Sequence, residues 1–294
     1  MRRSRVFVPG HATCFFSSSY DIENPLKTGS IGVGFCTARG SYITVEYEAS
    51  ENERQVQCYE KGKPVNFPVS SETALEYLKK AKIHGRVTIY HELGYPIKTG
   101  LGMSASGSLG TAMALNSILG TLTPLETHQL AHIAEVKHHT GLGDVIAQLT
   151  GGFEARIRAG GPGYGKIKQF NVETEILLVF FGPLETTTVL TNEKFHKKAN
   201  EIGKIYLQEF LKEPSLQKAS MLGRQFCEET NLLTSEIESF IKLFPPNIAS
   251  GMILIGNAAY IFIDDIETLL RRFPKIKKYN WQKTKISPIG AIIC

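Results

Sequence analysis

The stretch "PIKTGLGMSASGSLG", residues 96–110, constrains the fold more than any other part of this chain. It follows an apolar run at 86–91, and a helical pattern at 104–119 begins within it. Three glycines among its first twelve residues let the backbone come close to a ligand. The first amides of a helix have no partner inside the helix, and the helix dipole adds partial positive charge there. This strand–loop–helix unit therefore predicts an anion site built from N–H groups.

A second glycine-rich run, "GGPGYGK" at 160–166, competes for the phosphate-binding role. It matches the first part of a P-loop, but Ile167 stands where that motif needs Ser or Thr to reach magnesium. A P-loop also leads into a helix, whereas both "FEARIRA" and "KIKQFNV" on its flanks have the pattern of strands. We therefore interpret the second run as a turn between two strands.

Composition indicates a packed globular chain without membrane or nucleic-acid partners. The 294 residues are 42% hydrophobic and 21% charged, enough for one large or two ordinary domains. The apolar run at 176–181 is too short to cross a bilayer. Five scattered cysteines without a Cys-x-x-Cys pair favour a reducing cytoplasm. The net charge of +5 is mild, so we interpret the one basic cluster, at 271–283, as a solvated face.

The order of predicted elements favours an α+β fold. Pro9 and Gly10 are expected to end a first strand at 5–8, so the basic N-terminus is not interpreted as a targeting segment. A capping box of Thr123 and Glu126, with Pro124 between them, begins a helix that should end near 140–141. The other expected elements are strands at 42–48, 55–60, 86–91, 153–159, 166–172, 175–181 and 285–293, helices at 70–85, 104–119, 193–212, 215–230, 234–243 and 265–273, and a hairpin around Gly256-Asn257. Long helices with hairpins, without regular βαβ alternation, are typical of α+β proteins.

The phosphate-loop candidate resembles the signature of the GHMP kinase superfamily, Pro-x-x-x-Gly-Leu-Gly-Ser-Ser-Ala. Met103 stands where that signature has its first serine. The matching order continues in "VFVPGH" at 6–11, in Glu135, in an aspartate before a Gly-Gly pair, and in "SGMILIGNAAYIF" and "SPIGAII" near the end. The resemblance implies a nucleotide cradle formed by Pro96, Gly100, Leu101, Gly102, Met103, Ser104, Ala105, Ser106 and Gly107.

That resemblance also implies a fold and a set of site residues. It implies a two-lobed molecule, with a lobe like domain 2 of ribosomal protein S5 over 1–172 and a ferredoxin-like lobe over 173–294. ATP would lie over the loop amides, with Mg²⁺ held by Ser104 and Glu135. Asp144 would accept the proton of the acceptor hydroxyl. His11 stands where many relatives have Lys or Arg, and it would supply a catalytic cation beside Asp144. From the residues alone, Asp144 could equally cap the next helix.

Within the superfamily, the N-terminal third is most similar to the archaeal pantoate kinases. The similarity is carried by "VPGHATCFF" at 8–16, "NPLKTGSIGVGF" at 24–35 and "HTGLGDV" at 139–145. It implies phosphorylation of the primary hydroxyl of (R)-pantoate to 4-phosphopantoate, a step toward coenzyme A. Candidate acceptor contacts are His11, Thr13, Ser30, Gly32, Gly34 and Thr186, with Thr187 as a weaker one and Phe15 and Phe16 as an apolar wall. Two alternatives stay open: the two glycines could form a tight turn, and the two phenylalanines could belong to the core.

Other functions are compatible with parts of this pattern. A homoserine, shikimate or mevalonate kinase would share the loop, the metal ligands and the base. A non-catalytic, ligand-sensing relative would share the fold, but it need not keep Ser104, Glu135 and Asp144 together. The histidines at 128, 132 and 139 lack the ligands of a zinc site and favour a solvated or helix-terminal cluster. A homodimer is compatible with the sequence.

Overall fold

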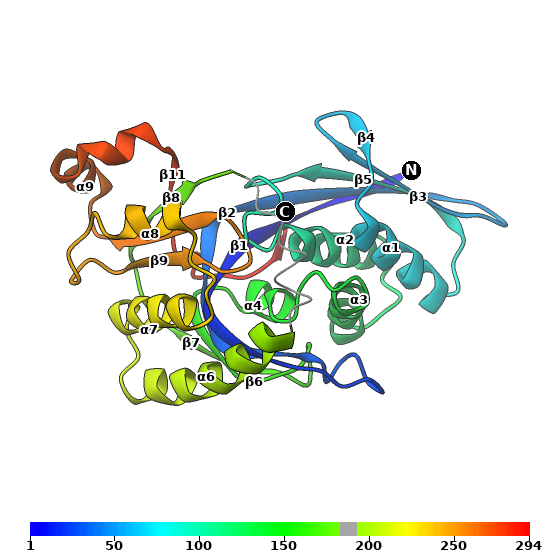
Figure 1. Ribbon diagram of the computed structural model, residues 1–294. Coiled ribbons are helices and arrows are strands. Elements are labelled where there is room, and N and C mark those ends of the chain that lie inside the picture. The colour runs from blue at the N-terminus through cyan, green and yellow to red at the C-terminus, as the bar shows by residue number, and fades with distance from the viewer. Residues whose placement is uncertain (183–192) are drawn as a thin grey trace.

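The computed structural model describes residues 1–182 and 193–294, in two β-sheets that carry helices (Figure 1). Thr186 and Thr187 lie outside the described residues. The larger sheet has the order β12-β1-β2-β5-β3-β4, with β6 and β7 joined to it through β2. Its strands are β1 Arg2–Ser19, β2 Gly29–Ala49, β3 Arg54–Glu60, β4 Lys63–Val65, β5 Gly85–Glu92, β6 Phe153–Arg158, β7 Lys166–Phe170 and β12 Ile292–Ile293. The 160–166 run is therefore a connection between two paired strands, β6 and β7, as its pattern predicted.

The helices next to the glycine-rich loop are α1 Pro68–Lys80, α2 Met103–Leu119, α3 Pro124–Lys137 and α4 Asp144–Thr150. Of these, α1, α2 and α4 contact the larger sheet, and α3 packs on α1 and α2. The capping box at the start of α3 is confirmed, because the Thr123 side chain accepts from the Glu126 amide and Glu126 accepts in return. Two predicted helix ends were too late. The first helix ends at Lys80 because Lys82 adopts a left-handed φ of 56°, and α3 ends before His139, whose φ is 54°.

The smaller sheet has the strand order β11-β8-β10-β9 and is antiparallel throughout. Its strands are β8 Glu175–Phe180, β9 Ser250–Ile253, β10 Ala258–Ile263 and β11 Asn280–Lys285. The helices α6 Glu193–Lys212, α7 Leu216–Glu229 and α8 Ser235–Ile241 lie between its first two strands in the chain, and α9 Ile266–Arg272 and a 3₁₀ turn at Pro274–Lys278 precede its last. A βαββαβ order with this strand arrangement is the ferredoxin-like fold. The two-lobed expectation is therefore confirmed, and the hairpin around Gly256-Asn257 joins β9 to β10 as predicted.

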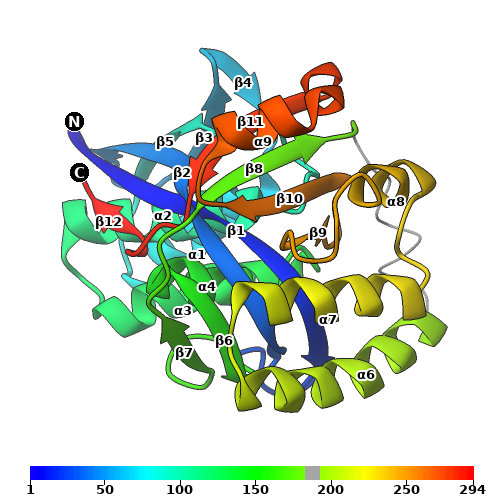
Figure 2. The ribbon, with the colours of Figure 1, turned by 90° about the vertical axis from the view of Figure 1, so that its left-hand side faces the viewer.

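The strands β1 and β2 form one long ribbon that crosses both lobes (Figure 2). The prediction that Pro9 and Gly10 end the first strand was wrong. Pairing continues across them with a register shift, the kind of bulge at which a strand tolerates proline. The "GSIGVG" stretch lies within β2, so it is not a tight turn. Gly32 has a φ of 151°, and a Cβ there would lie 2.2 Å from the Phe15 carbonyl oxygen.

The part of the ribbon that contains Phe15 and Phe16 builds the core that the two lobes share. Phe15 packs against Tyr206 and Phe210 of α6, and Phe16 packs against Phe226 of α7. The two phenylalanines are therefore core residues rather than a wall of a substrate pocket. A separate core lies between α1 to α3 and the part of the ribbon that contains Ile43. It is centred on Ile43, Tyr77, Leu78 and Leu109.

The predicted strand at 285–293 was largely wrong. Its first residue, Lys285, instead ends β11, which pairs with β8 in the smaller sheet, and only Ile292 and Ile293 form a strand, paired with β1 in the larger one. The end of the chain thus returns to the first lobe, and the division of the chain at 172/173 stays a prediction. No helix in the described ranges is both long and apolar enough to span a membrane.

Candidate active site

The glycine-rich loop delivers the start of α2 to the boundary between the lobes. Gly102 is the N-cap with a left-handed φ of 66°, and as glycine it brings no side chain to satisfy the first helix amides. A Cβ at Gly102 would lie 2.9 Å from Gln148 Nε2 and 3.3 Å from Asp144 Oδ1. A Cβ at Gly100 would lie 2.6 Å from the Leu254 carbonyl oxygen at the β9–β10 turn. Both glycines are therefore required by close packing as well as by backbone conformation.

Most of the predicted cradle residues are buried by the protein itself. Gly100, Gly102 and Ser104 are partly exposed and Pro96 is exposed, whereas five are buried: Leu101, Met103, Ala105, Ser106 and Gly107. Ser106 donates to the Gly102 carbonyl and accepts from Gln148 Nε2 at 2.9 Å. What the loop offers a ligand is the backbone at the start of α2 and the side chain of Ser104.

Glu135 of α3 points its carboxylate at this helix start. Ser104 Oγ donates to Glu135 Oε1 at 2.6 Å, and Glu135 Oε2 is buried without a hydrogen-bond partner among the described residues. Burial raises the pKa of Glu135 to about 8, with a further upward contribution from the Asp144 charge, against the lowering effect of the Ser104 hydrogen bond. A Cβ at Gly141 would lie 2.6 Å from Glu135 Oε2 and 2.9 Å from Asp144 Oδ2. Glu135 Oε2 and Asp144 Oδ2 therefore face the same small space.

This oxygen set fits a magnesium ion. Mg²⁺ prefers carboxylate and hydroxyl oxygens and usually keeps several waters, so it is bound by few protein ligands. The buried and unpartnered Glu135 Oε2 is an acceptor that lacks a cation within the described part of the chain. No cluster of three or more His, Cys, Asp or Glu side chains suited to a metal occurs among residues 1–182 and 193–294. His132 instead places Nε2 2.9 Å from the Thr28 carbonyl oxygen.

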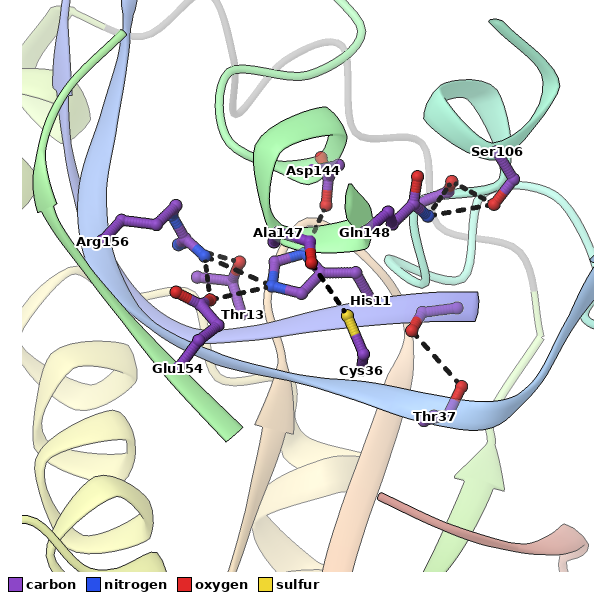
Figure 3. A network of polar contacts seen from close by, with 12 residues as sticks. His11, Thr13, Cys36, Thr37, Ser106, Asp144, Ala147, Gln148, Glu154 and Arg156 are labelled. Atoms are coloured by element: carbon purple, nitrogen blue, oxygen red, sulfur yellow. Dashed lines mark hydrogen bonds and ion pairs between the residues drawn. The ribbon is translucent and has the colours of Figure 1, made fainter. Parts of the chain in front are cut away.

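Asp144 is the first residue of α4, and its carboxylate reaches across to β1 (Figure 3). The N-cap of α4 is Gly143, so the alternative that Asp144 caps this helix does not hold. Instead, Asp144 Oδ1 lies 2.7 Å from His11 Nδ1. The His11 side chain is fully buried, whereas that of Asp144 is 24% exposed. His11 can therefore act on a bound molecule only through Asp144, which is itself partly exposed.

Behind His11 lies a buried ion pair from β6. His11 Nε2 is 3.1 Å from Glu154 Oε1, and Arg156 donates to the same carboxylate oxygen. Arg156 also lies 3.3 Å from Thr13 Oγ1 through Nη2. Burial alone would lower the pKa of His11, but its hydrogen bonds to Asp144 and Glu154 outweigh burial and raise the pKa above its usual value.

Glu154 and Arg156 were not predicted from the sequence as site residues. The signal was present in "FEARIRA", because residues two apart in a strand share one face, and both members of this pair carry charge. The pattern does not show that the pair is buried, because charges that alternate with Phe153, Ala155 and Ile157 are also typical of a strand with a solvated polar face. Arg156 is 1% exposed and Glu154 is fully buried.

The candidate acceptor contacts divide into two groups. Ser30 and Arg156 both border Gly143, where a Cβ would lie 2.5 Å from Ser30 Oγ and 2.7 Å from Arg156 Nε. Arg156 Nε is buried without a partner in the described residues, so it is a donor that an anionic group could satisfy. Gly32 and Gly34 lie in β2 between β1 and β6, so the sheet ladders compete for their amides. Gly34 leaves room for His11, since a Cβ there would lie 2.6 Å from His11 Nε2.

Comparison with known proteins gives a consistent set of relatives. The model of the GHMP kinases N terminal domain matches residues 68–152, the segment that contains the glycine-rich loop, Glu135 and Asp144. A pantoate kinase of Thermococcus kodakarensis is 38% identical over 269 residues, which cover 90% of this chain and 88% of that protein. A pantoate kinase of Methanocaldococcus jannaschii is 34% identical, over 90% of this chain and 94% of that protein. A solved structure described as a phosphotransferase related to CoA biosynthesis pathway superposes with a TM-score of 0.88 at 32% identity, over 100% of this chain and 99% of that one.

Proposed function

The chain belongs to the pantoate kinase family of GHMP kinases, and we propose that it transfers the γ-phosphoryl group of ATP to the primary hydroxyl of (R)-pantoate. The products would be 4-phosphopantoate and ADP, in a cytoplasmic step toward coenzyme A. The chain is an ATP-dependent small-molecule kinase. One observation carries the acceptor chemistry: the partly exposed Asp144 carboxylate lies beside the start of α2 and is held from behind by the buried His11.

The nucleotide phosphates would bind at the start of α2. The unsatisfied first amides and the helix dipole favour an anion there, and Gly102 lets the backbone approach it. Ser104 and Glu135 would hold Mg²⁺, which when bound neutralises charge on the transferred phosphoryl group. A cation there would also favour the ionised form of Glu135, the charge state that burial disfavours.

Asp144 would accept the proton of the attacking hydroxyl. His11 occupies Asp144 Oδ1, which leaves Oδ2 on the side that faces Gly141 and Glu135. Phosphoryl transfer has a loose transition state, so the position of this oxygen matters more than its basicity. We assign His11 the role of positioning Asp144, since its ring has no exposed surface from which to touch the acceptor.

The carboxylate of the acceptor would bind beside Gly143. Arg156 supplies a buried guanidinium whose Nε is free within the described ranges, and Ser30 and Thr13 supply hydroxyl groups near it. A planar guanidinium is well suited to a carboxylate. The roles of Gly32, Gly34 and Thr186 in acceptor binding stay predictions.

The direct test is ADP release by the purified protein with Mg²⁺ and ATP, run in parallel with pantoate, homoserine, shikimate and mevalonate. We expect turnover with pantoate alone, and ³¹P NMR of the product should place the phosphate on the primary oxygen. Turnover with another acid would keep the loop and the base but overturn the assignment of the acceptor. Acceptor binding without turnover would contradict catalysis and favour a ligand-sensing relative.

A further inference from the structure

We propose that Glu154 is a positioning residue that keeps His11 doubly protonated, so that a histidine serves as a permanent cation behind Asp144. The inference rests on the proposed role of Asp144 as the base. It concerns a carboxylate that solvent does not reach, since Glu154 is fully buried on β6. The four side chains involved come from three elements, β1, α4 and β6, and meet around the His11 ring (Figure 3).

The first step is the geometry of the His11 ring. Nδ1 lies 2.7 Å from Asp144 Oδ1, and Nε2 lies 3.1 Å from Glu154 Oε1. An ionised carboxylate can only accept hydrogen bonds, so each nitrogen that faces one must carry a hydrogen. A ring that satisfies both contacts is an imidazolium.

The second step is the role of Arg156, whose Nη1 lies 3.2 Å from His11 Nε2. If Arg156 donated to that nitrogen, His11 would be neutral. However, Nη1 makes its shorter contact with Glu154, and Nη2 is directed to Thr13. The guanidinium is therefore engaged mainly with the carboxylate, and the hydrogen between His11 and Glu154 remains to be supplied by the ring.

The third step is charge balance in a buried space. Asp144 and Glu154 carry two negative charges, and Arg156 supplies one positive charge. A neutral His11 would leave one net negative charge largely out of water, which is costly, whereas an imidazolium balances the set. From β2, Cys36 is the residue opposite His11, but its thiol donates to the Ala147 carbonyl, and burial raises the pKa of that thiol. It adds no charge.

The consequence concerns Asp144. With Glu154 present, Nε2 is a donor, and the charged ring holds Asp144 Oδ1 and leaves Oδ2 free to accept a proton. In a Glu154→Gln variant the amide can donate to Nε2, which stabilises the neutral ring. This substitution keeps the shape of the side chain and changes the charge state of His11.

The experiment is a ring-nitrogen NMR titration of ¹⁵N-histidine-labelled protein, in which His11 is identified by the signal lost in His11→Asn. In the native protein we expect His11 to titrate above a free histidine, with both nitrogens protonated at pH 7. In Glu154→Gln we expect its midpoint at least one pH unit lower. An unprotonated Nε2 at pH 7 in the native protein would overturn the proposal, and this measurement needs no variant to fold. It also needs no acceptor, so it can fail or succeed independently of the pantoate assay.

A kinetic readout separates positioning from a merely structural effect. In Glu154→Gln, kcat should fall about tenfold per pH unit above the lowered His11 midpoint, while the KM for ATP stays near the native value. The native enzyme should lack this falling limb over the same range. The surface substitution Glu238→Gln, which removes the same charge from the exposed pair with Lys242, should leave the profile unchanged. A uniform loss of kcat at every pH would contradict the role given to Glu154.

Discussion

Two buried glutamates flank the same aspartate, and their surroundings differ. Glu154 faces two cationic groups, His11 and Arg156, and is neutralised within the protein. Glu135 faces hydroxyl groups, from Ser104 and Thr140, and no cationic group among the described residues contributes to its pKa. Oε2 of each glutamate has no hydrogen-bond partner in the described part of the chain. Asp144 connects the two, since Oδ1 contacts His11 and Oδ2 faces the space beside Glu135.

The difference separates a carboxylate that belongs to the scaffold from one that awaits a ligand. A buried charge is stable only when it is paired and hydrogen-bonded. Glu154 Oε2 is also buried without a partner among the described residues, but Oε1 contacts both His11 and Arg156, so Glu154 can hold these groups in place. Glu135 has no such cationic contact within the described ranges, and burial raises its pKa to about 8. Buried carboxylates with raised pKa values are typical of functional sites.

The largest effect should come from the aspartate between them. We expect Asp144→Asn to lower kcat by about 10²–10⁴, the usual contribution of a general base. The asparagine oxygen can still accept from His11 Nδ1, so the fold and the thermal stability should change little. The check is kcat for ADP release at saturating ATP and acceptor, and near-native turnover of the folded variant would refute the base role.

We expect the next largest effect in the stability of Glu154→Gln and Glu135→Gln. The check is the free energy of unfolding in urea, measured without metal. Glu154→Gln leaves the buried Arg156 guanidinium without its carboxylate partner and should cost about 3–5 kcal/mol of stability. For Glu135→Gln we expect the opposite sign of the stability change at high pH. Because its folded pKa is raised, its stabilising contribution is complete below the pKa of the unfolded chain and is lost as the pH rises to about 8. At pH 9, Glu135→Gln should therefore be at least as stable as the native protein.

Equal losses of stability in the two variants would contradict this comparison. A large loss at pH 9 for Glu135→Gln alone would show that Glu135 has a partner within the protein. The outcome would then remove the physical argument for a cation site beside Ser104.

One half of this comparison could be predicted from the sequence and the other could not. The order of residues that resembles a known family singled out Ser104, Glu135 and Asp144, and the structure brings these three residues near one another. Glu154 and Arg156 acquire their meaning from His11, which is more than 140 residues away in the chain. A strand pattern shows that two charges share a face but not what that face meets.

The ribbon illustrates the same limit for the fold. Pro9 and Gly10 have the local chemistry of a strand end, yet the strand continues because β2 pairs with it on both sides of a bulge. Likewise, the final residues divide between two sheets because β11 pairs with β8 and β12 with β1. Tertiary pairing overrides local propensity at these places. The capping box of α3 was predicted correctly because its bonds are local.

The smallest and most specific effect should appear when Mg²⁺ is added to the protein without nucleotide. A metal ligand must be deprotonated, so Mg²⁺ competes with a proton for Glu135. Below the pKa of about 8 the dissociation constant should weaken about tenfold per pH unit, and above it the dissociation constant should level off. Thermal unfolding at a fixed Mg²⁺ concentration should therefore show little stabilisation at pH 6 and more at pH 9, by RT ln(1 + [Mg²⁺]/Kd), or about 2.7 kcal/mol at 100 times Kd.

Glu135→Gln should show no such pH dependence, whereas Glu154→Gln should keep it. A Mg²⁺ effect that is independent of pH, or that survives in Glu135→Gln, would place the ion elsewhere and leave Glu135 as an unexplained buried acid.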